Sequence, residues 1–201
     1  MPAASVASPA PDVPAGSTSR APVAAPTLVL PPVNATADYQ LGGAYTPARG
    51  VTVVTRDMTV VPARGTYGIC YVNAFQTQPE LRSWWLAKHP SLVLRDAHGR
   101  VVTDPGWPGE LLLDTSTAAK RASLASIMGV WFAHCRAVGY RAVEPDNLDS
   151  WTRSRGRLTL RQNATYAALL WRERTRSVSR SRRRTTPTCW RCARRRSSTS
   201  P

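Results

Sequence analysis

The chain has 201 residues and a formal net charge of +15, a length that suits one domain with a core and a charge that favours polyanionic partners. The charge is uneven, because residues 172–201 hold eleven arginines and one acid, so only five of the fifteen net charges belong to the rest of the chain. This distribution argues against specific nucleic-acid binding by the folded part, and no segment reaches the roughly 18 consecutive apolar residues of a membrane span.

Residues 1–35 are rich in Ala, Pro, Ser and Val and follow neither a helical nor a strand period. We interpret them as a disordered leader. The leader does not open with a basic segment followed by an apolar one, so we recognise no signal peptide in it.

From residue 36 to about residue 170, short apolar or β-branched runs predict strands and longer amphipathic stretches predict helices. The expected strands are Val51–Thr55, Gly68–Ala74, Glu110–Asp114 and Arg141–Pro145, with a short extended piece at Leu92–Arg95. The expected helices are Gln78–Lys88 and Thr117–Val138, and Gly139 ends the second of them. Strands that alternate with helices predict an α/β domain with a parallel sheet.

The helical pattern weakens after about Tyr166, although Leu169 and Leu170 extend a possible helix. Residues 171–201 form an Arg- and Ser-rich tail without periodicity, which we expect to be disordered. The abrupt change in composition suggests a frameshift, since shifted frames of GC-rich genes yield Arg, Ser, Thr and Pro. A genuine basic tail is the alternative.

Two of the four cysteines, Cys70 and Cys135, lie in the patterned part of the chain. Two widely spaced cysteines fit either a disulfide in an oxidising compartment or two buried thiols. The other two, Cys189 and Cys192, have no second pair and no histidine at metal spacing, and the three histidines of the chain are scattered. We therefore expect neither a metal site nor a cofactor.

The candidate catalytic residues are Glu144 and Asp146, two residues apart at the end of the last expected strand. With a strand period of two they point to the same face, roughly 6.5–7 Å apart along the backbone. Glycosidases use such carboxylate pairs, one as the acid/base and the other as a nucleophile or a base. The alternative is an acidic loop in which Asp146, Asn147 or Asp149 caps a following helix.

Further polar and aromatic residues are candidates for sugar binding, because amides bond hydroxyl groups and the face of a Trp packs on sugar C–H bonds. These candidates are Asp38, Gln40, Asn73, Trp107, Asp114, Asn147 and Asp149. The carboxyl ends of parallel strands meet at one edge of a sheet, which predicts Asp114 on the same rim as Glu144 and Asp146. Taken singly, each is more often structural than functional.

Four ordered segments together resemble glycoside hydrolase family 114, the endo-α-1,4-polygalactosaminidases. They are Asp38–Gly43 (DYQLGG), Ile69–Ala74 (ICYVNA), Trp107–Asp114 (WPGELLLD) and Ala142–Asp149 (AVEPDNLD). The last is the most specific, with E-P-D-N-x-D at a strand end that follows a helix ending in glycine. The resemblance covers roughly residues 36–165.

The resemblance implies a TIM-type (β/α)8 barrel that cleaves α-1,4-linked galactosamine polymers within the chain. It places a catalytic carboxylate, the expected nucleophile, at Asp146, while Glu144, Asn147 and Asp149 shape and charge the same subsite. It further implies a secreted, monomeric enzyme with a galactosamine-containing polysaccharide as its partner.

The same resemblance implies a disulfide between Cys70 and Cys135, as in secreted relatives. It also exposes a departure, because the second catalytic carboxylate of the family, a Glu, belongs on a later strand. Glu173, the one acid after Asp149, stands in the Arg-rich tail and is not assigned that role.

A complete barrel typically needs about 250 residues. We therefore expect residues 36–170 to hold about the first four β/α units and to be inactive if the chain is truncated there. Two other functions stay open at this point, a non-catalytic carbohydrate-binding fragment and polyanion binding by the basic tail.

Overall fold

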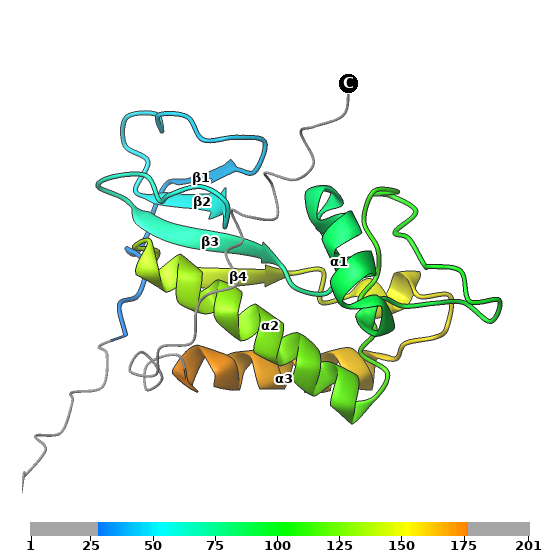
Figure 1. The fold of residues 1–201 in the computed structure, drawn as a ribbon. Coiled ribbons are helices and arrows are strands. Elements are labelled where there is room, and N and C mark those ends of the chain that lie inside the picture. The colour runs from blue at the N-terminus through cyan, green and yellow to red at the C-terminus, as the bar shows by residue number, and fades with distance from the viewer. Residues whose placement is uncertain (1–27, 177–201) are drawn as a thin grey trace, which may run out of the picture.

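Four short strands lie parallel, in chain order, in one sheet of the computed structural model, which describes residues 28–176 (Figure 1). They are β1 (Ala37–Gln40), β2 (Val53–Asp57), β3 (Tyr67–Asn73) and β4 (Ala142–Asp146). The central strands are rich in β-branched and aromatic residues, which fit a pleated and largely buried surface. The register aligns Tyr39 with Thr55, Thr55 with Ile69 and Ile69 with Ala142.

Two long helices, α2 (Ala118–Ala137) and α3 (Leu160–Arg176), lie side by side beneath the sheet (Figure 1). Thr117 caps α2 by accepting a hydrogen bond from the backbone of Lys120, and Gly139, at φ 107°, turns the chain after the helix ends. A disulfide joins Cys70 of β3 to Cys135 of α2, and both cysteines are fully buried. The helix layer is thus tied covalently to the centre of the sheet.

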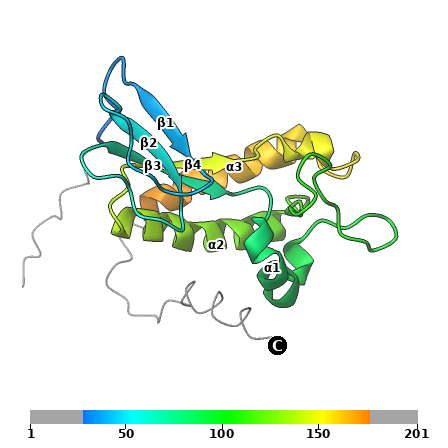
Figure 2. The ribbon, with the colours of Figure 1, turned by 90° about the horizontal axis from the view of Figure 1, so that it is seen from above.

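The long connection between β3 and α2 carries the short helix α1 (Arg82–Lys88), which lies beyond the ends of the strands (Figures 1 and 2). Three short 3-10 turns complete the fold: η1 (Pro79–Leu81) and η2 (Pro90–Leu92) in this connection, and η3 (Ser150–Arg153) after β4. Trp85 of α1 is fully buried and meets the rings of Trp84 and Trp131 edge-on, so most of this aromatic surface serves the core.

The prediction of a sheet strand at Glu110–Asp114 is wrong. This segment is buried as expected at Leu111–Leu113, but it forms isolated antiparallel bridges within the β3–α2 connection and does not enter the parallel sheet. Its partners are Gln76, Val93 and Thr103. An apolar run signals burial, and it does not say which neighbour supplies the backbone hydrogen bonds.

The structure also differs from the expected boundaries at both ends. Strand β1 was not predicted, and α3 continues through Arg176, past the expected end of the folded part at residue 170. Residues 1–27 of the expected leader and 177–201 of the expected tail lie outside the described residues.

Within residues 28–176, no helix is long and apolar enough to cross a membrane. Over the same residues the sheet has two edges, β1 and β4, so the structure establishes an α/β fold with a parallel sheet and not a closed barrel.

Candidate active site

The pairing register divides the side chains of the sheet between two faces. Tyr71 pairs with Glu144 and Asn73 pairs with Asp146, so these four side chains alternate onto the same face. Cys70 lies on the opposite face, where its disulfide to α2 marks the side that the helices cover. The two carboxylates of β4 therefore point away from the helix layer and lie beside polar side chains of β3.

Each carboxylate of β4 accepts a hydrogen bond from a tyrosine. The Tyr71 hydroxyl donates to Asp146 Oδ2 over 2.6 Å, and the Tyr39 hydroxyl donates to Glu144 Oε1 over 3.1 Å. The two rings pack edge to face with centroids 6.3 Å apart. Burial raises the pKa of both phenols, and the neighbouring carboxylates raise it further, so both hydroxyls remain protonated donors at neutral pH.

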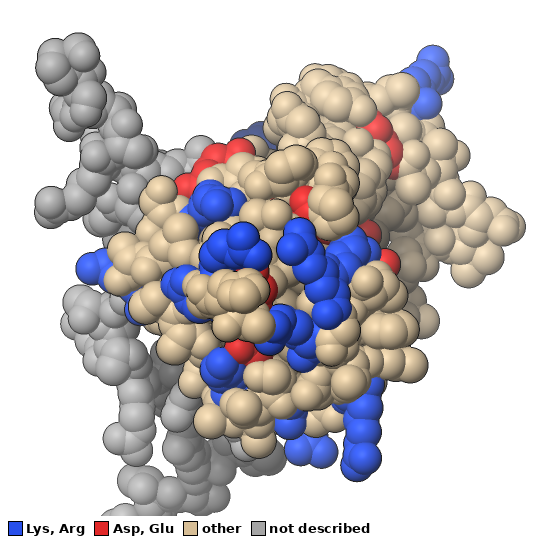
Figure 3. All heavy atoms as spheres, turned by 90° about the vertical axis from the view of Figure 1, so that its right-hand side faces the viewer, with Lys and Arg blue, Asp and Glu red and all other residues tan. Residues whose placement is uncertain are grey.

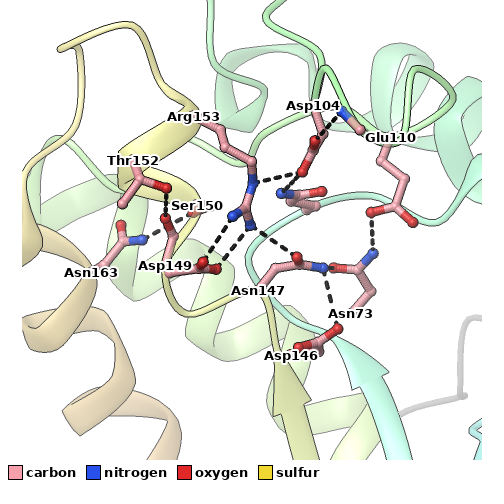
Figure 4. Close-up of polar contacts among 12 residues, drawn as sticks. Asn73, Asp104, Glu110, Asp146, Asn147, Asp149, Ser150, Thr152, Arg153 and Asn163 are labelled. Carbon is pink, nitrogen blue, oxygen red and sulfur yellow. Dashed lines mark hydrogen bonds and ion pairs between the residues drawn. The ribbon is translucent and has the colours of Figure 1, made fainter.

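A pair of asparagine amides connects Asp146 to a third carboxylate, that of Glu110 (Figure 4). Asn147 Nδ2 lies 3.0 Å from Asn73 Oδ1 and 3.5 Å from Asp146 Oδ2, and Asn73 Nδ2 donates to Glu110 Oε2 over 2.8 Å. Burial raises the pKa of Glu110, the charges of Asp104 and Asp146 raise it further, and the bond from Asn73 opposes the shift.

Arg153 holds the other side of this network together (Figure 4). Its guanidinium forms two 2.9 Å bonds to the carboxylate of Asp149, and its Nη2 also donates to Asn147 Oδ1 over 3.0 Å. Its Nε lies 2.6 Å from Asp104 Oδ2 as an ion pair. The bonds from Arg153 lower the pKa of Asp149. For Asp104, burial raises the pKa, but bonds from Gln76 and a backbone amide, together with the charge of Arg153, lower it overall.

The loop after β4 is anchored from below by α3. Asn163, which is 2% exposed, donates from its amide nitrogen to the Leu148 carbonyl and to the Ser150 hydroxyl, both over 2.9 Å. Its amide oxygen accepts a 2.6 Å bond from Thr115 at the entry to α2. The segment that follows Asp146 is therefore held by helix contacts and by Arg153 together, which fixes the backbone beside the candidate nucleophile.

A hollow of about 310 Å³ opens beside this network. It is lined by Asp104, Pro105, Gly106, Trp107, Asn147, Asp149 and Arg153. The Trp107 side chain is 68% exposed, so its ring is free to pack on a ligand. A hollow with an exposed aromatic ring and hydrogen-bonding groups has the chemistry that sugar recognition needs.

Comparison with known families decides the assignment. The model of glycoside-hydrolase family GH114 matches residues 17–178, which is most of the chain. The chain belongs to family GH114. This GH114 chain has no match among proteins with curated descriptions.

Three solved structures match part of the GH114 chain, and one of them has a TM-score above 0.5. The crystal structure of Aspergillus fumigatus Ega3 in complex with galactosamine has a TM-score of 0.58 and 21% identity, over 76% of this chain and 60% of Ega3. The glycoside hydrolase domain of a Pseudomonas aeruginosa PelA variant has 0.48 and 19%, over 69% of this chain and 55% of that domain's chain. Thermus thermophilus α-galactosidase TtGalA has 0.42 and 17%, over 63% and 30%. The GH114 chain thus spans about 60% of the length of Ega3.

Most of the predicted site residues of this GH114 chain come together. Those that meet within the network or line the hollow are Glu144, Asp146, Asn73, Asn147, Asp149 and Trp107. Asp114 does not join them, because its carboxylate pairs with Lys120 over 2.5 Å and accepts the backbone N–H of Ser116 at the start of α2.

Asp38 and Gln40 also lie apart from the β4 carboxylates. The register pairs Asp38 with Val54 and Val54 with Gly68, and Gln40 lies two residues after Asp38 on the same strand. Both side chains of β1 therefore point to the face that the helices cover. Gln40 donates to Asp38 and accepts from Arg56, so both side chains of β1 have protein partners. Sequence reasoning could not assign this face, because β1 itself was not predicted.

Five residues of the site were not predicted as site residues. They are Tyr39, Tyr71, Asp104, Glu110 and Arg153. Some signals were present in the sequence. Tyr71 is two residues before Asn73 in a strand, so both share a face, and Arg153 is four residues after Asp149, the spacing of an ion pair on one helical turn. In the described residues, no group of three or more His, Cys, Asp or Glu side chains is arranged to hold a metal ion.

Proposed function

We propose that this protein cleaves α-1,4-linked galactosamine polysaccharide within the chain, with Asp146 as the catalytic carboxylate that attacks the sugar. The observation that carries the proposal is the position of Asp146. It stands at the end of β4 in a family of glycoside hydrolases, bonded by Tyr71 and Asn147, and the next residue, Asn147, lines the hollow. The similarity to a fold crystallised with galactosamine supports the choice of sugar.

The architecture we propose is the first half of a TIM-type (β/α)8 barrel. In that fold the chemistry lies at the carboxyl ends of the strands. The parallel order β1-β2-β3-β4, with the network at the ends of β3 and β4, supports this. A barrel also requires strands beyond β4, where a second catalytic carboxylate would stand.

Glu144 is the second catalytic candidate in the described residues. It lies two residues before Asp146 on the same face of β4, so it is further from the carboxyl end of the strand. Its carboxylate accepts a hydrogen bond from Tyr39. We propose that it supports the charge of the subsite and that Asn73, Asn147, Asp149 and Trp107 position the sugar.

We further propose secretion and a monomeric state. The buried disulfide between Cys70 and Cys135 supports an oxidising compartment, where a polymer substrate would be met outside the cell. A polysaccharide is the expected partner, and no cofactor is required for carboxylate chemistry of this kind.

The test is hydrolysis of α-1,4-galactosamine oligomers by the full chain, by Asp146→Asn and by Asp96→Asn. The last variant removes one carboxylate charge from a surface turn where Asp96 bonds Arg100. We expect new reducing ends from the wild type and from Asp96→Asn and none from Asp146→Asn. Product from all three alike, or from none, would remove the catalytic assignment. Binding without cleavage would instead favour a carbohydrate-binding role.

A further inference from the structure

A second hollow, of about 460 Å³, lies where the chain enters the helices α2 and α3. It is lined by Ser116, Arg121, Thr159, Arg161, Gln162 and Thr165. In the part of the chain that the structure describes, none of these six residues bonds to the network around Asp146 or lines the hollow beside it. The second hollow is therefore separate from the candidate active site.

Hydrogen bonds between the two helix entries hold the walls of this hollow in place. Gln162 Nε2 donates to the Ser116 carbonyl over 3.1 Å, and Gln162 Oε1 accepts from the backbone of Thr159 over 2.8 Å. Arg121 Nη1 donates to the carbonyls of Thr115 and Ser116 over 2.7 and 3.2 Å. The walls are thus preorganised, so a ligand that entered the hollow would not have to order them.

Two guanidinium groups line the hollow without an acidic partner. Within residues 28–176, no carboxylate oxygen lies within 4.0 Å of Arg121 or Arg161. Asp114, which is two residues before Ser116, already pairs with Lys120. Arg121 is only partly exposed, and its Nε is buried without a hydrogen-bond partner. Because a partly buried cation without a counter-charge is costly, an anion in the hollow would stabilise it.

The hollow also offers neutral hydrogen-bond donors. Thr159 Oγ1 accepts a 3.3 Å bond from the backbone of Gln162, and among the described residues neither this hydroxyl nor that of Ser116 donates one. A phosphate group has several acceptor oxygens in a tetrahedral arrangement, and it takes guanidinium and hydroxyl donors from different sides. A planar carboxylate has only two oxygens and would leave more of these donors unpaired.

The surrounding surface is basic. Figure 3 views the molecule from the right-hand side of Figure 1, where α2 and α3 begin, and Lys and Arg side chains gather across the middle of that face, with acidic side chains between and beside them. Arg155 and Arg157, in the loop that leads to α3, are exposed, and over residues 28–176 neither has a carboxylate oxygen within 4.0 Å. Unpaired positive charge of this kind raises the local concentration of anions.

We propose that this hollow binds a phosphate group, with Arg121 and Arg161 pairing with its charge and the hydroxyls of Ser116 and Thr159 donating to its oxygens. The inference goes beyond the proposed function and does not depend on it, because the hollow shares no residue with the candidate active site. Free phosphate and a phosphodiester polymer present the same kind of group. A polymer repeats it, so one molecule has many opportunities to fill the hollow.

The test is a titration of the full chain with inorganic phosphate, followed by NMR at neutral pH and constant ionic strength. The backbone amide signals of Ser116, Gln162 and Thr165 report on the hollow separately from the arginines of residues 172–201. We expect these three signals to shift along one saturable curve that gives a single dissociation constant.

Two variants with the same change of charge locate the binding. Arg161 is exposed, and within the described residues its side chain makes no hydrogen bond or ion pair, so Arg161→Gln should leave the fold intact. We expect this variant to bind phosphate about tenfold more weakly, because it loses a charge-assisted contact. Arg141→Gln removes an exposed arginine just before β4, at the other end of the sheet from the start of α3, and should bind like the wild type (Figure 1).

Three outcomes would overturn the inference. The three amide signals stay in place or drift without saturating, Arg161→Gln keeps the affinity of the wild type, or both variants weaken binding equally, as unspecific attraction to net charge would require. The dispersion of the amide spectrum checks the fold of each variant. None of these outcomes bears on hydrolysis by Asp146, so the site and the proposed function fail separately.

A second titration, with an oligomer of glycerol phosphate, distinguishes the two sources of the group. Tighter binding per phosphate than for the free ion, read at the same amides and weakened in Arg161→Gln, identifies a phosphodiester polymer as the ligand. Equal binding per phosphate identifies the free ion. An oligomer that leaves these amides unshifted, while inorganic phosphate shifts them, supports a site for the free ion as well.

Discussion

The hydroxyl of Tyr71 on β3 donates a 2.6 Å hydrogen bond to Oδ2 of Asp146 on β4, between strands that are neighbours in the sheet. Because burial and the carboxylate raise the pKa of this phenol, the donor stays protonated well above neutral pH. The bond both orients the carboxylate and stabilises its charged form. Tyr39 provides the parallel contact to Glu144, over a longer distance of 3.1 Å.

If Asp146 is the catalytic carboxylate that we propose, Tyr71→Phe should lower kcat on galactosamine oligomers by about tenfold, which corresponds to losing about 1.4 kcal/mol of stabilisation at Asp146. KM should change little, because the hydroxyl is directed at Asp146 and not at the hollow. Steady-state kinetics measure both constants. Tyr39→Phe is the matched control and should have the smaller effect, and equal effects of the two variants would contradict the special role of Asp146.

Arg153 is a positioning residue, because it contacts Asn147 and two carboxylates at once while Asn147 contacts Asp146. Arg153→Lys keeps the charge but lacks the planar fork that reaches all three groups. We expect kcat to fall by about tenfold in this variant. Binding of the oligomer should fall less. A kcat that is unchanged while the melting temperature falls would reduce Arg153 to a purely structural role.

Asn147 has a left-handed backbone, with φ at 63°, immediately after the candidate nucleophile. Asn147→Gly and Asn147→Ala both remove the bonds to Asn73 and Arg153, but only alanine pays for the left-handed conformation. We expect Asn147→Ala to be less stable than Asn147→Gly by about 1 kcal/mol in urea unfolding. Equal stabilities would mean that the loop relaxes out of this conformation.

The longest elements were the ones that the sequence predicted well. The helix pattern at Thr117–Val138 corresponds to α2, and the run at Gly68–Ala74 overlaps β3. Strand β1 was missed, since four residues with two polar side chains and an exposed edge carry no alternation that burial would impose. The apolar run at Glu110–Asp114 revealed its burial but not its antiparallel partners.

The same limit applies to the site. Asp146, Asn147 and Asp149 lie close together in sequence, so their proximity in space can be predicted without knowing the fold. The contact between Asn73 and Glu110 joins residues 37 positions apart and depends on the path of the β3–α2 connection. The ion pairs of Asp104 and Asp149 with Arg153 likewise appear only when the loops are placed.

Removing the disulfide should lower the stability of the fold by a large amount. Cys70 and Cys135 are 65 residues apart, and closing a loop of that length stabilises the fold by about 4 kcal/mol in the chain-entropy model. The double variant Cys70→Ala and Cys135→Ala should lower the free energy of unfolding by roughly 2–5 kcal/mol, which chemical denaturation can measure. Wild type under strong reductant should approach the variant. A loss well below this range would indicate residual structure in the reduced unfolded chain.

The stability of the fold should depend on pH through the ionisation of Glu110. Its pKa is raised above the ordinary 4.5 by burial first and then by Asp104, Asp146 and Glu80, against the bond from Asn73. Below pH 4.5 the carboxyl is protonated in the folded and the unfolded state, so it does not change stability. As the pH rises, the unfolded state ionises first, and stability is lost until the pH passes the raised pKa of the folded state. Glu110→Gln removes this loss, so its melting temperature relative to wild type should increase from acidic to neutral pH. Thermal unfolding across that range measures the difference, and a constant difference would show that Glu110 ionises alike in both states.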